Sequence, residues 1–285
     1  MVGPDSVSSL TSKVIATDLK LANLLLGLMS HGSSHPCTWC DSSKSSLRFK
    51  GNLRTLGSLN DAFWRWYDET DQDKSKAKHF GNVIHCPILR GESSERVIDL
   101  LPPPELHLLI GPFNKMFKEL EKEWPEAMTW PRTCFVEREA IHGGLFNGNS
   151  CKKLLSKIDA LRSMCPLQGL KYVEDFEKFR KVVDACYGHD LDPDFRMIIR
   201  DFEKSYLSLG ISISPKVHTV FHHITDFCDS VHTGLGRYSE QAVEAVHADF
   251  KSTWAKYKFH EVNPRYPEQL LKAVSDYNAK HLRIF

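Results

Sequence analysis

From residue 105 onward, apolar residues recur at the three- and four-residue spacing of amphipathic helices, and short polar segments separate the runs. The pattern predicts helices over 105–123, 149–164, 172–187, 193–209, 215–230, 240–258 and 267–281. Three of them start at residues that favour a helix N-terminus, namely Asp192-Pro193, Ser214-Pro215 and Ser239. The sequence therefore predicts a helical assembly over this part of the chain.

The first hundred residues are predicted to contain the few strands. Short apolar runs, which we interpret as extended segments, lie at 13–16, 83–89 and 97–101. Three consecutive prolines, 102–104, end the last run, because proline has no backbone N–H for a sheet. Helices are expected over 19–29 and 58–69, with a polar loop over 30–46 between them.

The composition is that of an ordinary globular chain, with 285 residues of which 41% are hydrophobic and 26% charged. This excludes long disorder, collagen-like repeats and coiled-coil rods. Lysine and arginine number 37 against 36 acidic residues, which excludes a uniformly basic nucleic-acid wrapper but allows a local basic groove. No apolar run approaches the roughly 20 residues that span a bilayer, and no signal-peptide pattern is visible, so we expect a soluble intracellular protein with no membrane partner.

Cys37 and Cys40 are the only pair among the eight cysteines at a chemically suggestive spacing. Two thiolates two residues apart fit half of a tetrahedral zinc site, with an unligated pair and a redox pair as the alternatives. The helix expected near residue 220 offers His218 and His222, four residues apart on one face, and His223, five residues from the first. Either histidine pair would complete a site that joins residues far apart in the chain.

Carboxylates form a second signal. Asp18 follows the short predicted strand directly, and Glu240 and Glu244 lie four residues apart on the predicted 240–258 helix. Glu244 lies at the edge of the apolar face of that helix, which favours a half-buried carboxylate. The alternative for Asp18 is a helix N-cap, and the alternative for Glu240 is a favourable place near a helix N-terminus.

Basic residues form a third signal, because clustered lysine and arginine suit contacts to DNA phosphates. The candidate contacts are Lys44, Arg48, Lys50 and Arg54 in one loop, and Lys152 and Lys153 at the start of a helix. Ordinary solvated surface is the alternative for each cluster.

The stretch from Asp18 to Asp41 resembles the catalytic core of the V(D)J recombinase and of its transposon relatives, the Transib superfamily. In that family the second catalytic Asp precedes a helix and then a CxxC followed by Asp, as in Cys37-Thr38-Trp39-Cys40-Asp41. The two zinc-binding histidines of the family have four residues between them, which matches His218 and His223 and not His222.

Further matches follow in the same order as in the family. The segment that carries the catalytic Glu of the transposon form resembles Ser239-Glu240-Gln241-Ala242-Val243-Glu244, followed by Asp249-Phe250. Glu244 is therefore the catalytic match. Weaker matches are Leu101-Pro102-Pro103-Pro104-Glu105-Leu106-His107 and Asn147-Gly148-Asn149.

The resemblance implies a mainly α fold in which a partial RNase H-like α/β element is interrupted by a large helical insertion and closed by a zinc site. The expected segments are 1–40 with the second catalytic Asp, 41–213 as the helical insertion, and 214–285 with the zinc-closing, catalytic-Glu and C-terminal helices. Cys37, Cys40, His218 and His223 are implied as ligands of a structural Zn²⁺.

The implied activity is two-metal phosphodiester hydrolysis and strand transfer, with Asp18 and Glu244 as ligands of Mg²⁺ or Mn²⁺. The implied partner is double-stranded DNA at transposon ends, in the nucleus, with a homodimer as one assembly. The first catalytic Asp of the family lies far upstream of the second, and Asp5 is a poor substitute. We therefore expect a fragment or shortened remnant that is inactive alone, with a non-catalytic, zinc-stabilised DNA- or protein-binding module as the alternative.

Overall fold

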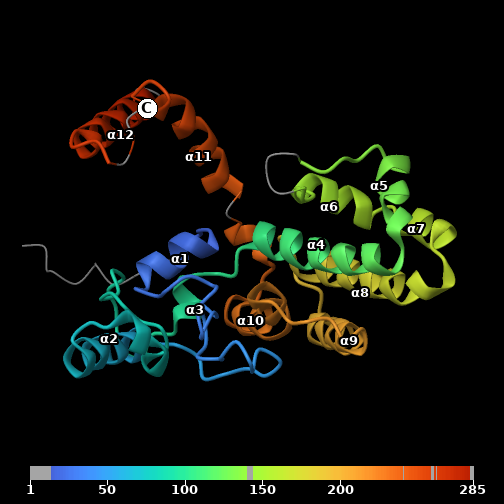
Figure 1. The fold of residues 1–285 in the computed structure, drawn as a ribbon, viewed down its shortest axis with the longest axis horizontal. Coiled ribbons are helices and arrows are strands. Elements are labelled where there is room, and N and C mark those ends of the chain that lie inside the picture. The colour runs from blue at the N-terminus through green and yellow to red at the C-terminus, as the bar shows by residue number, and fades with distance from the viewer. Residues whose placement is uncertain (1–13, 140–143, 240, 258–259, 261, 283–285) are drawn as a thin grey trace, which may run out of the picture. The chain divides into compact units, whose positions relative to one another are not determined.

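The computed structural model describes residues 14–139, 144–239, 241–257, 260 and 262–282, and the described part is mainly helical (Figure 1). It divides after Ser239 into two compact units. The predicted segment boundaries at residues 40 and 213 both fall inside the first unit and stay predictions. No described helix has the length and apolar character that crossing a membrane requires.

Helices make up almost all of the regular structure. The first unit contains α1 (Leu19–Leu25), α2 (Leu56–Thr70), η1 (Lys74–Phe80), α3 (Val97–Leu100), α4 (Glu105–Glu123), η2 (Pro125–Met128), α5 (Thr129–Thr133), α6 (Gly148–Leu155), α7 (Ile158–Met164), η4 (Leu167–Gly169), α8 (Leu170–Cys186), α9 (Phe195–Ser208), α10 (Pro215–Val231) and η5 (Leu235–Tyr238). The second unit contains α11 (Gln241–Trp254) and α12 (Tyr266–Leu282), which pack on each other.

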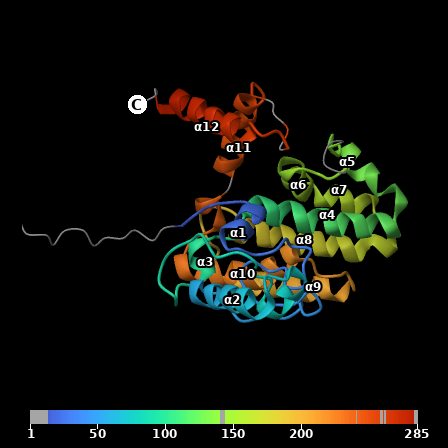
Figure 2. The ribbon, with the colours of Figure 1, turned by 60° about the vertical axis from the view of Figure 1, so that its left-hand side comes forward.

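Four long helices, α4, α8, α9 and α10, form the centre of the first unit (Figures 1 and 2). Helix α4 packs on α8 and α10, and α9 packs on the same two helices. Aromatic side chains fill the space between them. The ring centroids are 5.1 Å apart for Phe113 and Phe176, which join α4 to α8, and 5.7 Å apart for Phe202 and Phe221, which join α9 to α10. Burying large aromatic side chains provides much of the free energy of folding, so these contacts stabilise the packing of the four helices.

The helices predicted beyond residue 105 are confirmed within a few residues. The exception is 149–164, which forms two helices, α6 and α7, with Ser156 and Lys157 between them. The predicted start at Ser214-Pro215 is confirmed, because the side chain of Ser214 accepts a hydrogen bond from the Val217 N–H at the start of α10. The predicted start at Asp192-Pro193 is wrong, because α9 begins at Phe195 after Asp194, whose side chain makes no capping hydrogen bond.

The predicted strands are wrong, because the described residues contain no β-sheet. Val97–Leu100 is helix α3, and the described part of 13–16 contributes one hydrogen bond, from the Ile15 N–H to the Leu100 carbonyl at 2.8 Å. Isolated bridges such as Leu28 to Val83 do not continue into ladders. A sheet needs consecutive backbone N–H donors. The prolines at 102–104 have no N–H, so the pairing that the Ile15–Leu100 hydrogen bond begins cannot continue along the chain. The expected RNase H-like α/β element is therefore not supported.

One buried carboxyl group in this core lacks a charge partner. Asp175 of α8 is fully buried, and neither of its carboxyl oxygens has a hydrogen-bond partner among the described residues. Burial raises the pKa of Asp175 to about 7, and the neighbouring Ser205 and Lys178 counter this only in part. Below about pH 7 the folded chain therefore favours the protonated, neutral form of Asp175.

Replacing Asp175 with Asn is expected to stabilise the chain by about 2–4 kcal/mol at pH 8, because the wild-type carboxyl must ionise there in a buried place. With a folded pKa near 7 against 3.8 for the free group, the wild type loses stability as the pH rises from about 4 to about 7. The gain in Asp175→Asn should vanish near pH 4. Urea unfolding across this pH range measures it, and Asp184→Asn on the exposed face of the same helix is the control. Equal pH profiles for wild type and Asp175→Asn would contradict the assignment.

Candidate metal centre

Two cysteines of a loop and two histidines of α10 meet in the interior of the first unit. Cys37, Cys40, His218 and His223 are all buried, and their ligand atoms lie within 4.8 Å of one another. The sequence separation is 178 residues between Cys40 and His218 and 186 between Cys37 and His223. The predicted ligand set is therefore confirmed as a cluster that can hold a structural zinc ion.

The distances fit a tetrahedral ion. The Sγ atom of Cys37 lies 3.3 Å from Nε2 of His223, and Sγ of Cys40 lies 3.3 Å from Nε2 of His218. The two Nε2 atoms are 3.2 Å apart. Zinc bonds of about 2.3 Å to sulfur and about 2.0 Å to nitrogen give tetrahedral edges of roughly 3.3–3.8 Å. A two-thiolate, two-imidazole donor set in this arrangement is typical of structural zinc.

The third histidine of α10 takes no part in the cluster. The Nε2 atom of His222 lies 3.2 Å from the Arg48 carbonyl oxygen, and burial lowers the pKa of this imidazole to about 4. His218 and His223 are five residues apart, so their Cβ atoms diverge on the helix, and both rings turn toward the cysteine loop. The i, i+4 pair of His218 and His222 is therefore not the one the fold uses.

Hydrogen bonds behind the ligands fix both imidazole rings. Nδ1 of His218 lies 2.8 Å from the Leu47 carbonyl oxygen, and Nδ1 of His223 lies 3.0 Å from Oδ2 of Asp226. Asp226 also forms an ion pair with Lys50. These acceptors assign the proton to Nδ1 of each ring, which leaves Nε2 free to bind metal. Although burial lowers the pKa of His223, its bonds to Asp226 and Cys40 outweigh that effect and raise it.

The two thiols differ in their environments. Burial raises the pKa of Cys37, whereas the hydrogen bond from Cys37, together with His218 and His223, lowers the pKa of Cys40. A thiolate at Cys40 beside the two imidazoles is the electrostatic arrangement that a divalent cation completes. Zinc binding displaces the remaining thiol proton, so the metal affinity falls as the pH is lowered.

Arg54 was expected to contact DNA, and this expectation is wrong. The side chain is only 5% exposed, and its Nε donates to the carbonyl oxygens of Cys37 and Cys40 at 3.3 and 3.0 Å. Its Nη2 donates to the Gly81 carbonyl oxygen at 3.0 Å. The guanidinium therefore holds the backbone of the metal-binding loop. No spacing rule in the sequence distinguishes it from the exposed basic residues beside it.

The other expected DNA contacts lie at the surface with different partners. Lys44 and Arg48 are exposed and form no ion pair with a described residue. Lys50 pairs with Asp226, Lys152 pairs with the buried Glu105 at 3.2 Å, and Lys153 donates to the Phe135 carbonyl oxygen at 3.3 Å. These three contact charged or polar groups of the chain itself, which reduces their availability to a phosphate.

The two expected catalytic carboxylates lie in different units. Oδ1 of Asp18 accepts a hydrogen bond from the Leu21 N–H at 2.7 Å. Asp18 is therefore the N-cap of α1, which was the alternative to a catalytic function. Glu244 lies in α11, but its side chain and the whole of Glu240 lie outside the described residues. The meeting of Asp18 and Glu244 on shared metal ions stays a prediction.

No protein-family model and no curated protein matches the sequence of this chain. The ligand set therefore stands on the chemistry and geometry of its four side chains.

Replacing His223 with Ala is expected to abolish stoichiometric zinc binding and to lower the melting temperature, because the cluster loses one of four ligands. Replacing His222 with Ala is the matched control and should leave one zinc per chain, since that ring contacts only the Arg48 carbonyl oxygen within the described loop. Zinc content after dialysis, measured by mass spectrometry, separates the two. Loss of zinc in His222→Ala with retention in His223→Ala would overturn the ligand set.

Removing Asp226 is expected to weaken zinc binding by roughly 10–100-fold, because His223 loses the carboxylate that orients its ring. Asp226→Ala is compared with Asp229→Ala, which removes an exposed ion pair with Arg196 from the same helix. Competition with a chromogenic chelator gives the affinities. Equal zinc affinity in the two variants would show that Asp226 does not support the site.

Proposed function

We propose that this chain is the zinc-closed part of a DDE-type transposase or recombinase catalytic core that acts on double-stranded DNA in the nucleus. The observation that carries the proposal is the pairing of Cys37 and Cys40 with His218 and His223. The sequence resembles the family's zinc site at these four residues, and the resemblance selects His223 over His222. In the structure His223, and not His222, lies beside the two cysteines, which is independent support for the resemblance.

The zinc in this proposal is structural. The loop and α10 supply all four ligands, so no coordination position is left for water or substrate. The loop lies 19 residues after Asp18, and α10 ends 13 residues before Glu244 (37 minus 18, and 244 minus 231). A zinc ion that ties the loop to α10 would therefore fix the chain near both proposed catalytic acids.

Asp18 retains the capacity to bind a cation. Only its Oδ1 is used by the Leu21 N–H, which leaves Oδ2 without a bond to another described residue. Asp18 and Glu244 would hold Mg²⁺ or Mn²⁺, which when bound activates water or a 3′-hydroxyl for attack on a phosphodiester. Two carboxylates without a third bind such an ion weakly, so we expect little or no strand cleavage by this chain alone.

A non-catalytic, zinc-stabilised DNA-binding module is the second candidate. The observations that favour it are the lack of a β-sheet among the described residues and the use of Asp18 as a helix cap. Both candidates require DNA binding, and they differ in whether the carboxylates act on the phosphodiester.

The zinc-loaded chain is expected to bind duplex DNA with a salt-dependent affinity, measured by fluorescence anisotropy. Lys44→Glu/Arg48→Glu should reduce the salt slope by about 0.9 for each DNA phosphate that the variant no longer neutralises. Lys78→Glu/Lys181→Glu, which changes two exposed lysines elsewhere in the first unit, makes the same change in net charge and is the control.

A strand-cleavage assay with Mg²⁺ or Mn²⁺ separates the two candidates. Cleavage by the wild type that disappears in Asp18→Asn would support the catalytic core and show that two acids suffice. Cleavage that is absent in the chain but restored by an added upstream segment would support the core as a fragment. Absence of cleavage in both forms leaves the binding module, and absence of salt-dependent DNA binding by the zinc-loaded wild type would contradict both candidates.

A further inference from the structure

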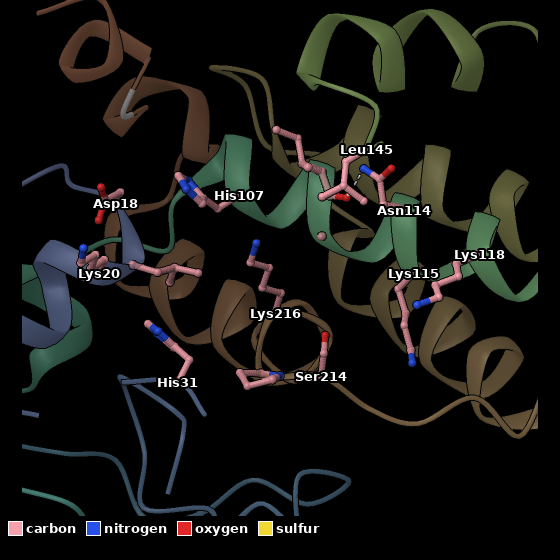
Figure 3. Close-up of a pocket in the computed structure, with 14 residues that line it drawn as sticks. Asp18, Lys20, His31, His107, Asn114, Lys115, Lys118, Leu145, Ser214 and Lys216 are labelled. Atoms are coloured by element: carbon pink, nitrogen blue, oxygen red, sulfur yellow. Dashed lines mark hydrogen bonds between the residues drawn. The ribbon is translucent and has the colours of Figure 1, made fainter. Parts of the chain in front are cut away.

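A cleft with a cavity of about 710 Å³ lies between α1, the loop before the cysteines, the first half of α4 and the start of α10 (Figure 3). Its described lining residues include four lysines and two histidines, namely Lys20, His31, His107, Lys115, Lys118 and Lys216. Asp18 is the only acidic residue among those that line it. Lys20, Lys115 and Lys216 come from three different helices, α1, α4 and α10, so the fold brings these lysines together.

Most of this positive charge is not neutralised. Lys115 donates to Ser212 and lies 3.6 Å from Glu119, but Lys20, Lys118 and Lys216 form no ion pair with a described residue. Burial lowers the pKa of Lys216, and burial together with the charge of Lys216 lowers the pKa of His31. A half-enclosed site with several cations and one carboxylate has a positive potential that an anion would complete.

The position of Lys216 is built into the packing of α10 on α4. A Cβ atom placed on Gly111 would lie 2.3 Å from Cδ of Lys216, so the lysine stem crosses α4 at a residue without a side chain. Figure 3 shows the Lys216 side chain rising from α10 toward α4. This close approach points the ammonium group into the cleft.

Part of the lining of the cleft, here named the apolar floor, consists of apolar side chains. Leu19, Ile110, Leu145 and Pro215 line it together with the aliphatic parts of the lysines. A cavity of this size is in the range of small-molecule sites, and an apolar floor with a cationic rim suits a ligand that is flat and apolar at one end and anionic at the other. A nucleotide has this chemistry, and an imidazole such as that of His31 can stack on a base.

We propose that this cleft binds an unpaired nucleotide, with its phosphate at the lysines that line the cleft and its base over the apolar floor. The base of a paired nucleotide inside a duplex is not free to enter, so the occupant is either an unpaired strand end or a free nucleotide. The strand-end form rests on the proposed function, because it makes the cleft part of a DNA-binding surface beside Asp18.

The test compares Lys20→Gln/Lys216→Gln with Lys78→Gln/Lys181→Gln, a control with the same net charge and with both changes at exposed positions. The probes are a short labelled single-stranded oligonucleotide and a blunt duplex of the same sequence. For the single strand, the cleft variant should bind at least about tenfold more weakly than the control, and its salt slope should be lower by about 0.7 for each phosphate no longer neutralised. For the blunt duplex, the two variants should differ by less than about threefold.

Gly111→Ala is a second variant that changes no charge. The added methyl group must displace the Lys216 stem, so single-strand affinity should fall by several-fold while zinc content stays at the wild-type value. This variant keeps the proposal open to refutation if the double lysine variant fails to fold. Unchanged single-strand affinity in a folded Gly111→Ala chain, or in a folded double variant, would overturn the proposal.

Competition separates the two sources of the nucleotide. Displacement of the single strand by a deoxynucleoside monophosphate supports a free-nucleotide site, and retention of the strand, with weaker binding by the cleft variant, supports a strand-end site. Equal displacement by inorganic phosphate would contradict the role of the apolar floor. If the cleft variant loses single-strand binding but keeps duplex binding, the nucleotide cleft and the proposed DNA-binding function are both supported. If the wild type binds the single strand but no duplex, only the proposed function is contradicted.

Discussion

The junction of the cysteine loop with α10 is the constraint on which the first unit depends. Cys40 and His218 are 178 residues apart in sequence, and the entropy of closing so long a loop must be offset by the interactions formed at the junction. Two thiols and two imidazoles packed together in the interior are poorly satisfied by each other alone. A zinc ion converts these buried polar groups into metal bonds, so the same four residues that hinder folding without metal favour it with metal.

Helix α10 connects the metal-binding residues to the rest of the first unit. Its middle carries His218 and His223, and its first turn carries Lys216, which crosses α4 at Gly111. The loop that supplies the cysteines also supplies His31, whose Nε2 lies 3.3 Å from Oγ1 of Thr38 between the two cysteines. The metal centre and the cationic cleft therefore share the cysteine loop and α10, and the cleft also uses α1 and α4.

The spacing of cysteines and histidines predicts a metal centre but leaves His222 and His223 as alternatives, and the family resemblance decides between them. A CxxC and two histidines on one helix carry their chemistry in their spacing, and the aromatic helices beyond residue 105 are evident from their period. The extended segments were not predictable in the same way. A short, largely apolar segment such as Val97–Leu100, in which Asp99 is the one charged residue, fits a strand or a helical turn equally. Packing against α10 decides between them. The function of Arg54 depends on carbonyl groups that have no sequence signature.

Charge shows most clearly what folding adds to the sequence. Lysines that cluster along the chain become neutralised by distant acids, as Lys50 does with Asp226 and Lys152 does with Glu105. Lys20 and Lys216 are far apart in sequence, yet both line one cleft and neither pairs with an acid among the described residues. Because electrostatic potential depends on distance in space and on burial, the net charge of +1 and the basic runs of the sequence indicate little about where an anion binds. The uncompensated cations lie where three elements converge, beside the one carboxylate of the first unit that the resemblance marks as catalytic.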